Sequence, residues 1–291
     1  DGRMAFYSGD DARGEYLYKF VPDGAYRPGE PDHNASLLDS GTLYAAQFKA
    51  DGTGRWLPLR FGEPGLTAQH GFSDQQAVLL NSRGAADAAG ATPMDRPEWV
   101  AVHPQTREAY VTLTNNTDRG KAQPTDAANP RSENLHGQIL RWREAGANPT
   151  AEEFEWDIFL LAGERQNAEQ SIPANRVGNI TGDLFSSPDG LAFDSAGRLW
   201  ILTDADETAP YMSDIGSNQM LCADPLSREV RRFLVGPWGA EITGITWSPD
   251  ETAMWVNVQH PGISYPASDG QSRPRSTTVL ITREDGGVLG S

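Results

Sequence analysis

The sequence predicts an all-β fold, a β-propeller, because strand-turn-strand units recur along the chain and each begins with an acid. The units read EWVAVHPQTREAYVTLTNN from Glu98, DGLAFDSAGRLWILTD from Asp189 and EITGITWSPDETAMWVNVQH from Glu241. In each unit, two strand-like apolar runs flank a polar turn. Further strand-like segments follow each unit, and units of this four-stranded kind at unequal spacing are typical of propeller blades.

The segment before these units adds strands and a helical insertion. Residues 3–9 read as a strand that closes on acids, as the second strand of a blade does, with its inner partner absent. A turn and another strand follow over 10–24, and residues 41–62 form a hairpin with the turn ADGTG. The Ala-rich stretch near residues 73–90 predicts one helix or two short ones between blades, with Ser73 as the N-cap.

The C-terminal segment VLITRED reads as a third strand without a fourth. A propeller closes its ring when one terminus completes the blade begun by the other. We therefore interpret residues 1–291 as one propeller domain that is a fragment of a longer chain or has its missing strands supplied otherwise. Long polar loops over 117–137, 163–187 and 260–275 are expected on the scaffold, and such loops commonly carry function.

Composition excludes several classes of partner. The 291 residues carry a formal net charge of −16, which argues against binding to nucleic acid or to an anionic membrane. No apolar run approaches the roughly 18 residues that a membrane-spanning helix needs. The single cysteine, Cys222, lies in the strand-like segment QMLCAD and reads as a buried, unreactive thiol. We expect a monomer.

The acids at the strand starts predict a metal site. Because the first strand of each blade is innermost, Glu98, Asp189 and Glu241 should face one another at the central channel. Hairpin geometry also brings Asp204, at the end of a second strand, beside Asp189. Such crowded like charges raise one another's pKa unless a cation neutralises them, and oxygen-rich sites suit calcium, iron or manganese. The alternative is that these acids only solvate the strand ends.

The chain resembles the PhoX alkaline phosphatases over nearly its whole length, and it corresponds to the C-terminal portion of such proteins. The order of several motifs carries the resemblance: FYSGDDARGEYLYKFV, GTLYAAQFKADGTGRWLPL, TPMDRPEWVAVHP, VTLTNNT, FSSPDGLAFDSAGRLWI, RRFLVGPWGAEITGITWSPD and VNVQHPG. The resemblance implies a periplasmic or secreted metal-dependent phosphomonoesterase that acts on small phosphate esters with iron and calcium at its site.

The resemblance also implies roles for individual residues. In the RPEW motif, Arg96 would hold phosphate oxygens, and the alternative for Arg96 is a salt bridge to Asp95 or to the acidic ring. The expected metal ligands are Glu15, Glu98, Asp189 and Glu241. The family draws further ligands, including a cysteine thiolate, from a segment upstream of this one. Cys222 does not sit in that motif, so the isolated chain is expected to hold an incomplete site.

Two other functions remain open at this stage. The stretch PDGLAFDSAGRLWILTD also resembles the repeat of calcium-dependent lactonases of the gluconolactonase type. The RPEW motif and the GDD…EYLYKF opening are not features of that group. The second alternative is a non-catalytic propeller that serves as a binding platform.

Overall fold

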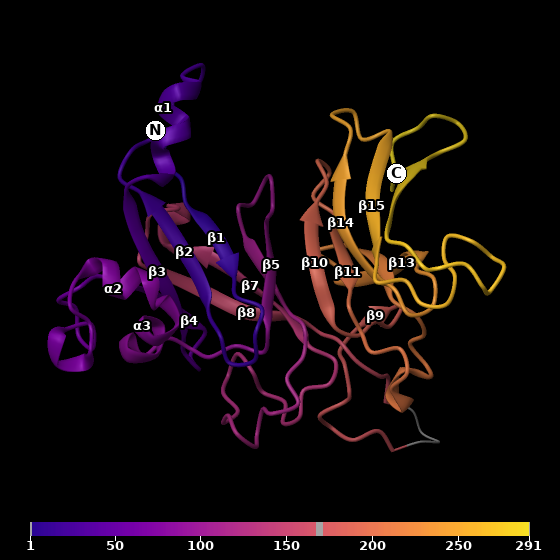
Figure 1. The fold of residues 1–291 in the computed structure, drawn as a ribbon, viewed down its shortest axis with the longest axis horizontal. Helices are drawn as coiled ribbons and strands as arrows, with labels where there is room; N and C mark the ends of the chain where they lie inside the picture. The colour runs from indigo at the N-terminus through magenta and orange to yellow at the C-terminus, as the bar shows by residue number, and fades with distance from the viewer. Residues whose placement is uncertain (1, 167–170, 291) are drawn as a thin grey trace.

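The fold is a set of antiparallel sheets arranged as successive propeller blades, in a computed structural model that describes residues 2–166 and 171–290 (Figure 1). The first blade contains β1 (Phe6–Gly9), β2 (Leu17–Pro22), β3 (Gly41–Phe48) and β4 (Thr53–Pro58), and the second contains β5 (Pro97–Val102), β6 (Ala109–Leu113), β7 (Gln138–Glu144) and β8 (Glu153–Leu161). The third contains β10 (Pro188–Phe193), β11 (Leu199–Thr203), β12 (Gln219–Ala223) and β13 (Glu229–Val235), and β9 (Thr181–Gly182) pairs in parallel with β13. The fourth contains β14 (Glu241–Trp247), β15 (Ala253–Gln259) and β16 (Thr277–Thr282). The predicted all-β propeller is confirmed.

The predicted first strands occupy the inner positions. In Figure 1, β5, β10 and β14 follow one another across the middle of the molecule, and each contacts the next. Each runs antiparallel to the second strand of its own blade, so the starts of the first strands and the ends of the second strands lie at one rim. We call this edge the active rim.

Strand β1 has the geometry of a second strand, as predicted. It ends at the active rim and contacts β5, in the way that the second strand β6 contacts β10. A side chain at Gly9 would collide with the backbone oxygens of Pro97 and Glu98, so this glycine permits the close approach of β1 to β5. Among the described residues, β1 is an edge of its sheet.

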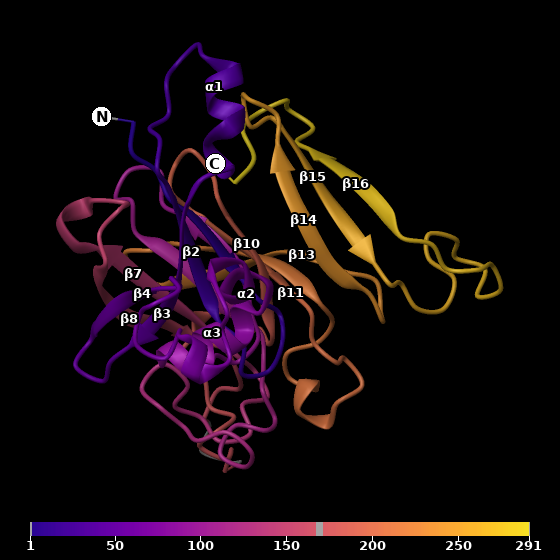
Figure 2. The ribbon, with the colours of Figure 1, turned by 60° about the vertical axis from the view of Figure 1, so that its left-hand side comes forward.

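The blades pack face to face through apolar side chains. Every residue of β6 (AYVTL) and β11 (LWILT) is buried, because these strands lie between neighbouring blades. One core cluster joins the second and third blades and includes Tyr110, Phe159 and Leu221; another joins the third and fourth and includes Trp200, Ile242 and Met254. Cys222 lies in β12, half-buried, and burial raises the pKa of its thiol to about 11. In Figure 2, β14, β15 and β16 form a sheet of their own, which packs against the third blade through the second of these clusters.

The predicted insertion consists of two helices, α2 (Gln75–Leu80) and α3 (Ser82–Ala89), between β4 and β5. The prediction of Ser73 as the N-cap is wrong by one residue, since the Asp74 carboxylate accepts the Ala77 N–H at 2.8 Å. A further short helix, α1 (Pro31–Ala35), projects beyond the sheets in Figures 1 and 2. Short 3-10 helices lie in the connections: η1 (Ser36–Leu38), η2 (Ala68–His70), η3 (Ala145–Ala147) and η4 (Pro210–Met212).

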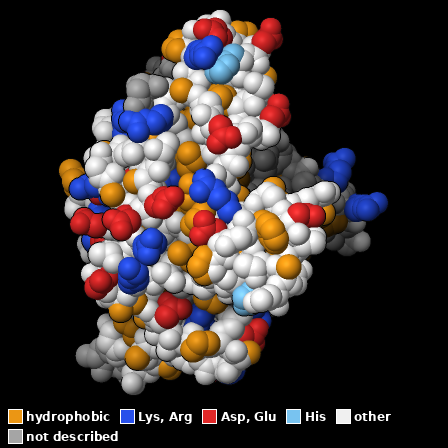
Figure 3. Space-filling model, turned by 90° about the vertical axis from the view of Figure 1, so that its left-hand side faces the viewer, with side chains coloured by type: hydrophobic (Ala, Val, Ile, Leu, Met, Phe, Trp, Pro, Cys, Tyr) orange, Lys and Arg blue, Asp and Glu red, His pale blue; other side chains and the backbone are white. Residues whose placement is uncertain are grey.

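The surface carries mixed charge despite the acidic composition. On the face shown in Figure 3, acidic and basic side chains are interspersed, so the negative charge is not gathered there into one patch. Within residues 2–166 and 171–290, no helix is long and apolar enough to cross a membrane.

Candidate functional site

Four predicted residues meet at the active rim. Glu98 is the second residue of β5, Asp189 the second of β10 and Glu241 the first of β14, and Arg96 lies just before β5. Their charges act on one another: Asp189 raises the pKa of Glu98, and Glu241 raises that of Asp189. The ends of the second strands add further polar side chains to this rim: Asp11 after β1, Asp204 after β11 and His260 after β15. We call these seven residues the rim cluster.

A repeated backbone turn directs the acids to this rim. Two residues before Glu98, Asp189 and Glu241, the chain takes a left-handed conformation, with φ of 58° at Arg96, 51° at Ser187 and 74° at Gly239. A β-bulge follows near the start of each first strand. Left-handed non-glycine residues cost about 1–3 kcal/mol and occur preferentially at functional sites.

Arg96 is held by Asp11 at the rim. Its Nε and Nη2 donate to the two carboxylate oxygens of Asp11 at 2.7 and 3.0 Å, and Nη2 lies 4.0 Å from Asp204 Oδ2. Burial favours the neutral form of Arg96, but the hydrogen bonds and charge of Asp11 nevertheless raise its pKa. Of the two alternatives for Arg96, the salt bridge to Asp95 is absent from the interactions of the described residues, and the pairing is with the acidic cluster instead.

Four acids of the cluster, Glu98, Asp189, Asp204 and Glu241, bind protons more tightly than free carboxylates do, whereas hydrogen bonds from Arg96 and Glu98 outweigh burial and lower the pKa of Asp11. Burial, a hydrogen bond to Asp11 and the charge of Asp189 raise the pKa of Glu98 to about 9. Burial, with the charges of Glu241 and Asp204, raises the pKa of Asp189 to about 7. A metal-free cluster therefore carries protons near neutral pH in place of its full negative charge.

The far side of the cluster joins the third and fourth blades. Gln259, directly opposite Glu241 in the β14–β15 pair, donates its Nε2 hydrogen to Glu241 Oε2 at 2.7 Å. Burial and the charge of Asp204 raise the pKa of Glu241, and His260 opposes this shift. Burial likewise raises the pKa of Asp204, while Arg96 lowers it.

Glu15 is placed in a neighbouring group of charges. Its Oε2 lies 3.5 Å from Arg83 Nε of α3, and Arg83 also binds Asp10. Burial raises the pKa of Glu15, Arg83 lowers it, and Asp10 and Asp87 raise it further. Glu15 Oε2 is buried without a hydrogen-bond partner among the described residues. The structure therefore does not join Glu15 to the rim cluster through any interaction that it describes.

Behind Arg96 lies a buried polar network that sequence reasoning missed. Asp95 is fully buried and accepts hydrogen bonds from Arg119 Nε at 2.7 Å and from the side-chain amides of Asn116 and Asn134, both at 2.9 Å. Arg119 also donates to the backbone carbonyls of Pro93 and Pro124. The loop over 117–137 thus braces the residue that precedes Arg96. Its richness in Asn, Asp and Arg was the signal that could have revealed this role.

A second network lies behind Asp189. His136 is fully buried; its Nδ1 lies 3.0 Å from Ser186 Oγ and its Nε2 lies 3.3 Å from Glu164 Oε1. Burial lowers the pKa of His136 to about 3, so this histidine is neutral. The His136 carbonyl accepts the Ser187 N–H at 2.8 Å, and the Ser187 carbonyl accepts the Asp204 N–H at 3.0 Å. His136, at the end of the loop over 117–137, thereby helps to fix the left-handed turn before Asp189.

The donor chemistry of the cluster suits a hard cation. Carboxylates dominate it, and their pKa values are raised first by burial and then by neighbouring negative charge, which a cation would neutralise. In residues 2–166 and 171–290, however, no three Asp, Glu, His or Cys groups converge closely enough to enclose a metal ion. The residues therefore fit a metal in chemistry, and their side chains would have to move to enclose one.

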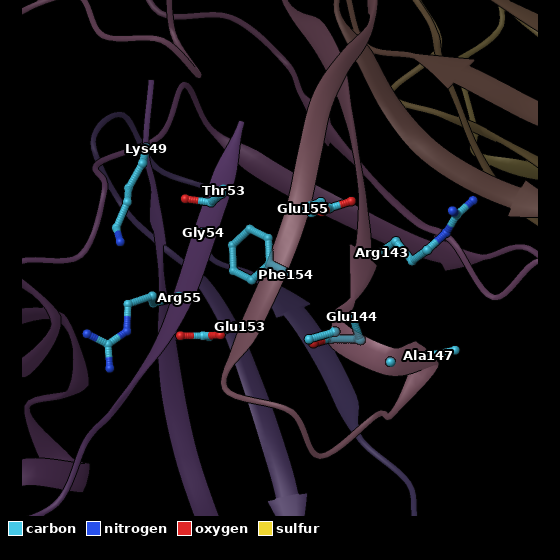
Figure 4. Close-up of a pocket in the computed structure, with 12 residues that line it drawn as sticks. Lys49, Thr53, Gly54, Arg55, Arg143, Glu144, Ala147, Glu153, Phe154 and Glu155 are labelled. Carbon is cyan, nitrogen blue, oxygen red and sulfur yellow. The ribbon is translucent and has the colours of Figure 1, made fainter. Parts of the chain in front are cut away.

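Two cavities help to delimit the site. One of about 210 Å³ opens at the cluster and is lined by Asp204, Glu241 and His260 together with loop residues of the third and fourth blades. A larger cavity, about 500 Å³, lies where β4 pairs with β8, with Phe154 between the two strands (Figure 4). Its lining mixes cations and carboxylates, and its Glu144 already binds Lys19 Nζ at 3.0 Å and the Tyr7 hydroxyl at 2.6 Å. We therefore place the candidate site at the rim cluster.

Comparisons with known proteins agree on one family. A family model described as alkaline phosphatase PhoX matches residues 1–262. The structure of Pseudomonas fluorescens PhoX in complex with vanadate, a transition state analogue, is 47% identical with a TM-score of 0.94. That match covers 100% of this chain and 52% of the other, so this chain spans about half the length of the protein it matches.

Another similarity is too weak to carry an argument. A gluconolactonase of Xanthomonas campestris matches with 15% identity and a TM-score of 0.29, over 66% of this chain and 60% of that one. No curated protein matches the chain.

Proposed function

Because the chain belongs to the PhoX family of alkaline phosphatases, we propose that it forms the phosphate-binding part of a phosphomonoesterase. The observation that supports this most directly is the rim cluster, where a half-buried arginine lies among carboxylates of raised pKa. The substrates proposed are small phosphate monoesters. The lactonase alternative gains no support from a structural likeness as weak as the one found.

Arg96 is the proposed phosphate-binding residue. A guanidinium binds two oxygens of a phosphoryl group through parallel N–H donors, as Arg96 now binds the two oxygens of Asp11. Bound substrate would therefore replace Asp11 as the bidentate acceptor of the two Arg96 hydrogen bonds.

Members of this family are metal-dependent, and we propose calcium and iron for this site. Glu98, Asp189 and Glu241 would hold cations at the rim, and Glu15 would contribute through Oε2, which is buried, accepts no hydrogen bond among the described residues and lies 3.5 Å from Arg83 Nε. Bound cations would neutralise phosphoryl charge and support in-line attack. Around them, Arg96 orients the ester and the buried networks keep the turns at Arg96 and Ser187 fixed.

We further propose that residues 1–291 are one propeller domain within a longer protein, called here the extended protein. The half-length match to the Pseudomonas fluorescens chain and the second-strand geometry of β1 support this interpretation. Family members are commonly exported, and we propose a periplasmic or secreted monomer.

Hydrolysis of p-nitrophenyl phosphate tests the proposed function. We expect turnover by the extended protein in the presence of iron and calcium, and little or none by residues 1–291 alone. Arg96→Lys should weaken binding of substrate and inorganic phosphate while the fold is retained, because lysine lacks the bidentate fork. Unchanged kinetics for Arg96→Lys would remove Arg96 from the site. Equal turnover by both chains would refute the incomplete-site interpretation.

A further inference from the structure

The cavity of about 210 Å³ beside the rim cluster extends outward between the third and fourth blades. At its inner end lie Asp204, Glu241 and His260, which belong to the rim cluster. Its outer wall includes Asp206 and Trp238, which the proposed phosphate site does not use. This volume equals that of roughly seven water molecules at about 30 Å³ each, which is enough for a small organic group.

The wall of this cavity is built from buried polar contacts. Glu207 is 7% exposed, and its two carboxylate oxygens accept the backbone N–H groups of Asn218, at 2.6 Å, and of Gly239. Asn218 in turn accepts the Ala205 N–H at 2.7 Å and the Thr203 hydroxyl at 2.9 Å. Glu207 therefore ties together the loop after β11, the start of β12 and the loop before β14. These hydrogen bonds hold the wall of the cavity in place without a ligand.

The lining has a definite chemical character. The charged side chains around the cavity are four carboxylates, Asp204, Asp206, Glu207 and Glu241, with His260 as the one basic group on the lining. Trp238 is 51% exposed and contributes an aromatic surface. Carboxylates beside an exposed indole repel anions and attract cationic groups, including ammonium groups that stack on the ring.

The cavity also has a fixed relation to Arg96. The Nη2 atom of Arg96 lies 4.0 Å from Asp204 Oδ2, and Asp204 lines the inner end of the cavity. A phosphoryl group on Arg96 would therefore sit beside the inner end of the cavity, with its ester oxygen able to point into the cavity.

We propose that this cavity binds the alcohol portion of the phosphate monoester and selects small neutral or cationic alcohols, amino alcohols above all, against anionic ones. The inference rests on the proposed phosphatase function, since it specifies the substrate class of the same site. Trp238 supplies the surface on which the ammonium group stacks, and Asp206 supplies negative charge at the outer wall.

The test compares phosphocholine, glycerol phosphate and 3-phosphoglycerate with the extended protein, loaded with iron and calcium. Turnover is measured for each ester with the loaded protein, and binding of labelled phosphocholine and 3-phosphoglycerate is measured separately by equilibrium dialysis of the extended protein in EDTA, in which the esters are not hydrolysed. We expect kcat/KM for phosphocholine to exceed that for 3-phosphoglycerate about tenfold or more. Trp238→Ala should lower both kcat/KM and binding for phosphocholine about tenfold and leave inhibition by inorganic phosphate unchanged.

Charge is tested with a matched pair of variants. Asp206 Oδ1 accepts the Thr208 N–H and hydroxyl at 3.0 and 2.6 Å, and Asp51 Oδ1 accepts those of Thr53 at 2.9 and 2.7 Å. Asp206→Asn should shift the preference between phosphocholine and 3-phosphoglycerate about threefold toward the anion, whereas Asp51→Asn, in the β3–β4 turn, should not. Phe61→Ala, at an aromatic residue 42% exposed, serves as the control for Trp238→Ala.

The outcomes separate the two claims. Turnover without preference, or a preference that Trp238→Ala leaves intact, would overturn the cavity proposal and leave the phosphatase function standing. Selective binding of phosphocholine that is lost in Trp238→Ala, without turnover of any ester, would support the cavity and overturn the phosphatase function. Neither turnover nor selective binding would overturn both.

Discussion

Asp95 and Asp189 are both buried acids near the active rim, yet their surroundings are opposite. Asp95 is fully buried and accepts hydrogen bonds from Arg119, Asn116 and Asn134. Asp189 is 5% exposed, and no hydrogen bond to its carboxylate occurs among the described residues. Burial, followed by the charges of Glu241 and Asp204, raises its pKa to about 7.

The difference separates a structural acid from a functional one. A buried carboxylate with its partners supplied by the fold stabilises that fold only as part of its network. A buried carboxylate crowded by like charges destabilises the fold unless a ligand arrives. We propose that the fold supplies hydrogen-bond partners to Asp95 from loop side chains and leaves Asp189 to bind a cation.

The largest expected effect is on Asp95. Asp95→Ala should lower the free energy of unfolding of residues 1–291 by about 3–5 kcal/mol, because the fully buried Arg119 would keep only its longer ion pair with Asp126, at 3.6 Å. Urea denaturation measures this change. The control is Asp118→Ala, which removes an exposed ion pair with Arg13 at 2.9 Å and should cost about 1 kcal/mol or less. Equal losses for the two variants would contradict the distinction.

The rim acids predict a pH dependence with the opposite sign to that of ordinary salt-bridged carboxylates. Folding raises the pKa of Asp189 from 3.8 to about 7 and the pKa of Glu98 from 4.5 to about 9. Between these pH values, the folded chain therefore binds more protons than the unfolded chain. In EDTA, the free energy of unfolding should therefore fall by roughly 2–4 kcal/mol as the pH rises from about 4 to about 9. Thermal unfolding across this range measures the slope. A flat or rising profile would show that folding does not raise the pKa values of these acids.

Asp189→Asn should reduce the dependence of the free energy of unfolding on pH. In EDTA at pH 8, this variant should be more stable than the wild type by about 1–3 kcal/mol, since it deletes a crowded charge and keeps the shape of the side chain. The same substitution in the extended protein should abolish most phosphatase activity. A variant that is less stable than the wild type under metal-free conditions would place Asp189 with Asp95 as a structural acid.

The smallest expected effect concerns the repeated turn. Ser187→Gly should raise the free energy of unfolding by up to about 1 kcal/mol, because glycine adopts φ of 51° without strain. Gly239→Ala, at the equivalent turn with φ of 74°, should lower it by about 1 kcal/mol. Differential scanning calorimetry of both variants decides whether the turns are equivalent.

Repetition made part of this site predictable from sequence. Glu98, Asp189 and Glu241 could be placed together because each occupies the same position in a repeated strand pair. Asn116, Arg119 and Asn134 could not be connected to Asp95, because their loop has no period and their contacts are set by packing.

The backbone at the rim and the surroundings of Glu15 were also beyond prediction. The left-handed conformations of Arg96 and Ser187 contradict the extended backbone that normally precedes proline. Glu15 was assigned by resemblance alone, and its partner Arg83 comes from a helix whose docking the sequence does not reveal.

Metal content tests most directly whether the rim acids serve a cation. The measurement is elemental analysis of the dialysed extended protein, compared with its Glu98→Gln/Asp189→Asn double variant and with Asp118→Asn as a control. We predict bound calcium and iron in the wild type and the control, and a loss of at least one metal equivalent in the double variant. The same metal content in all three proteins would contradict the account.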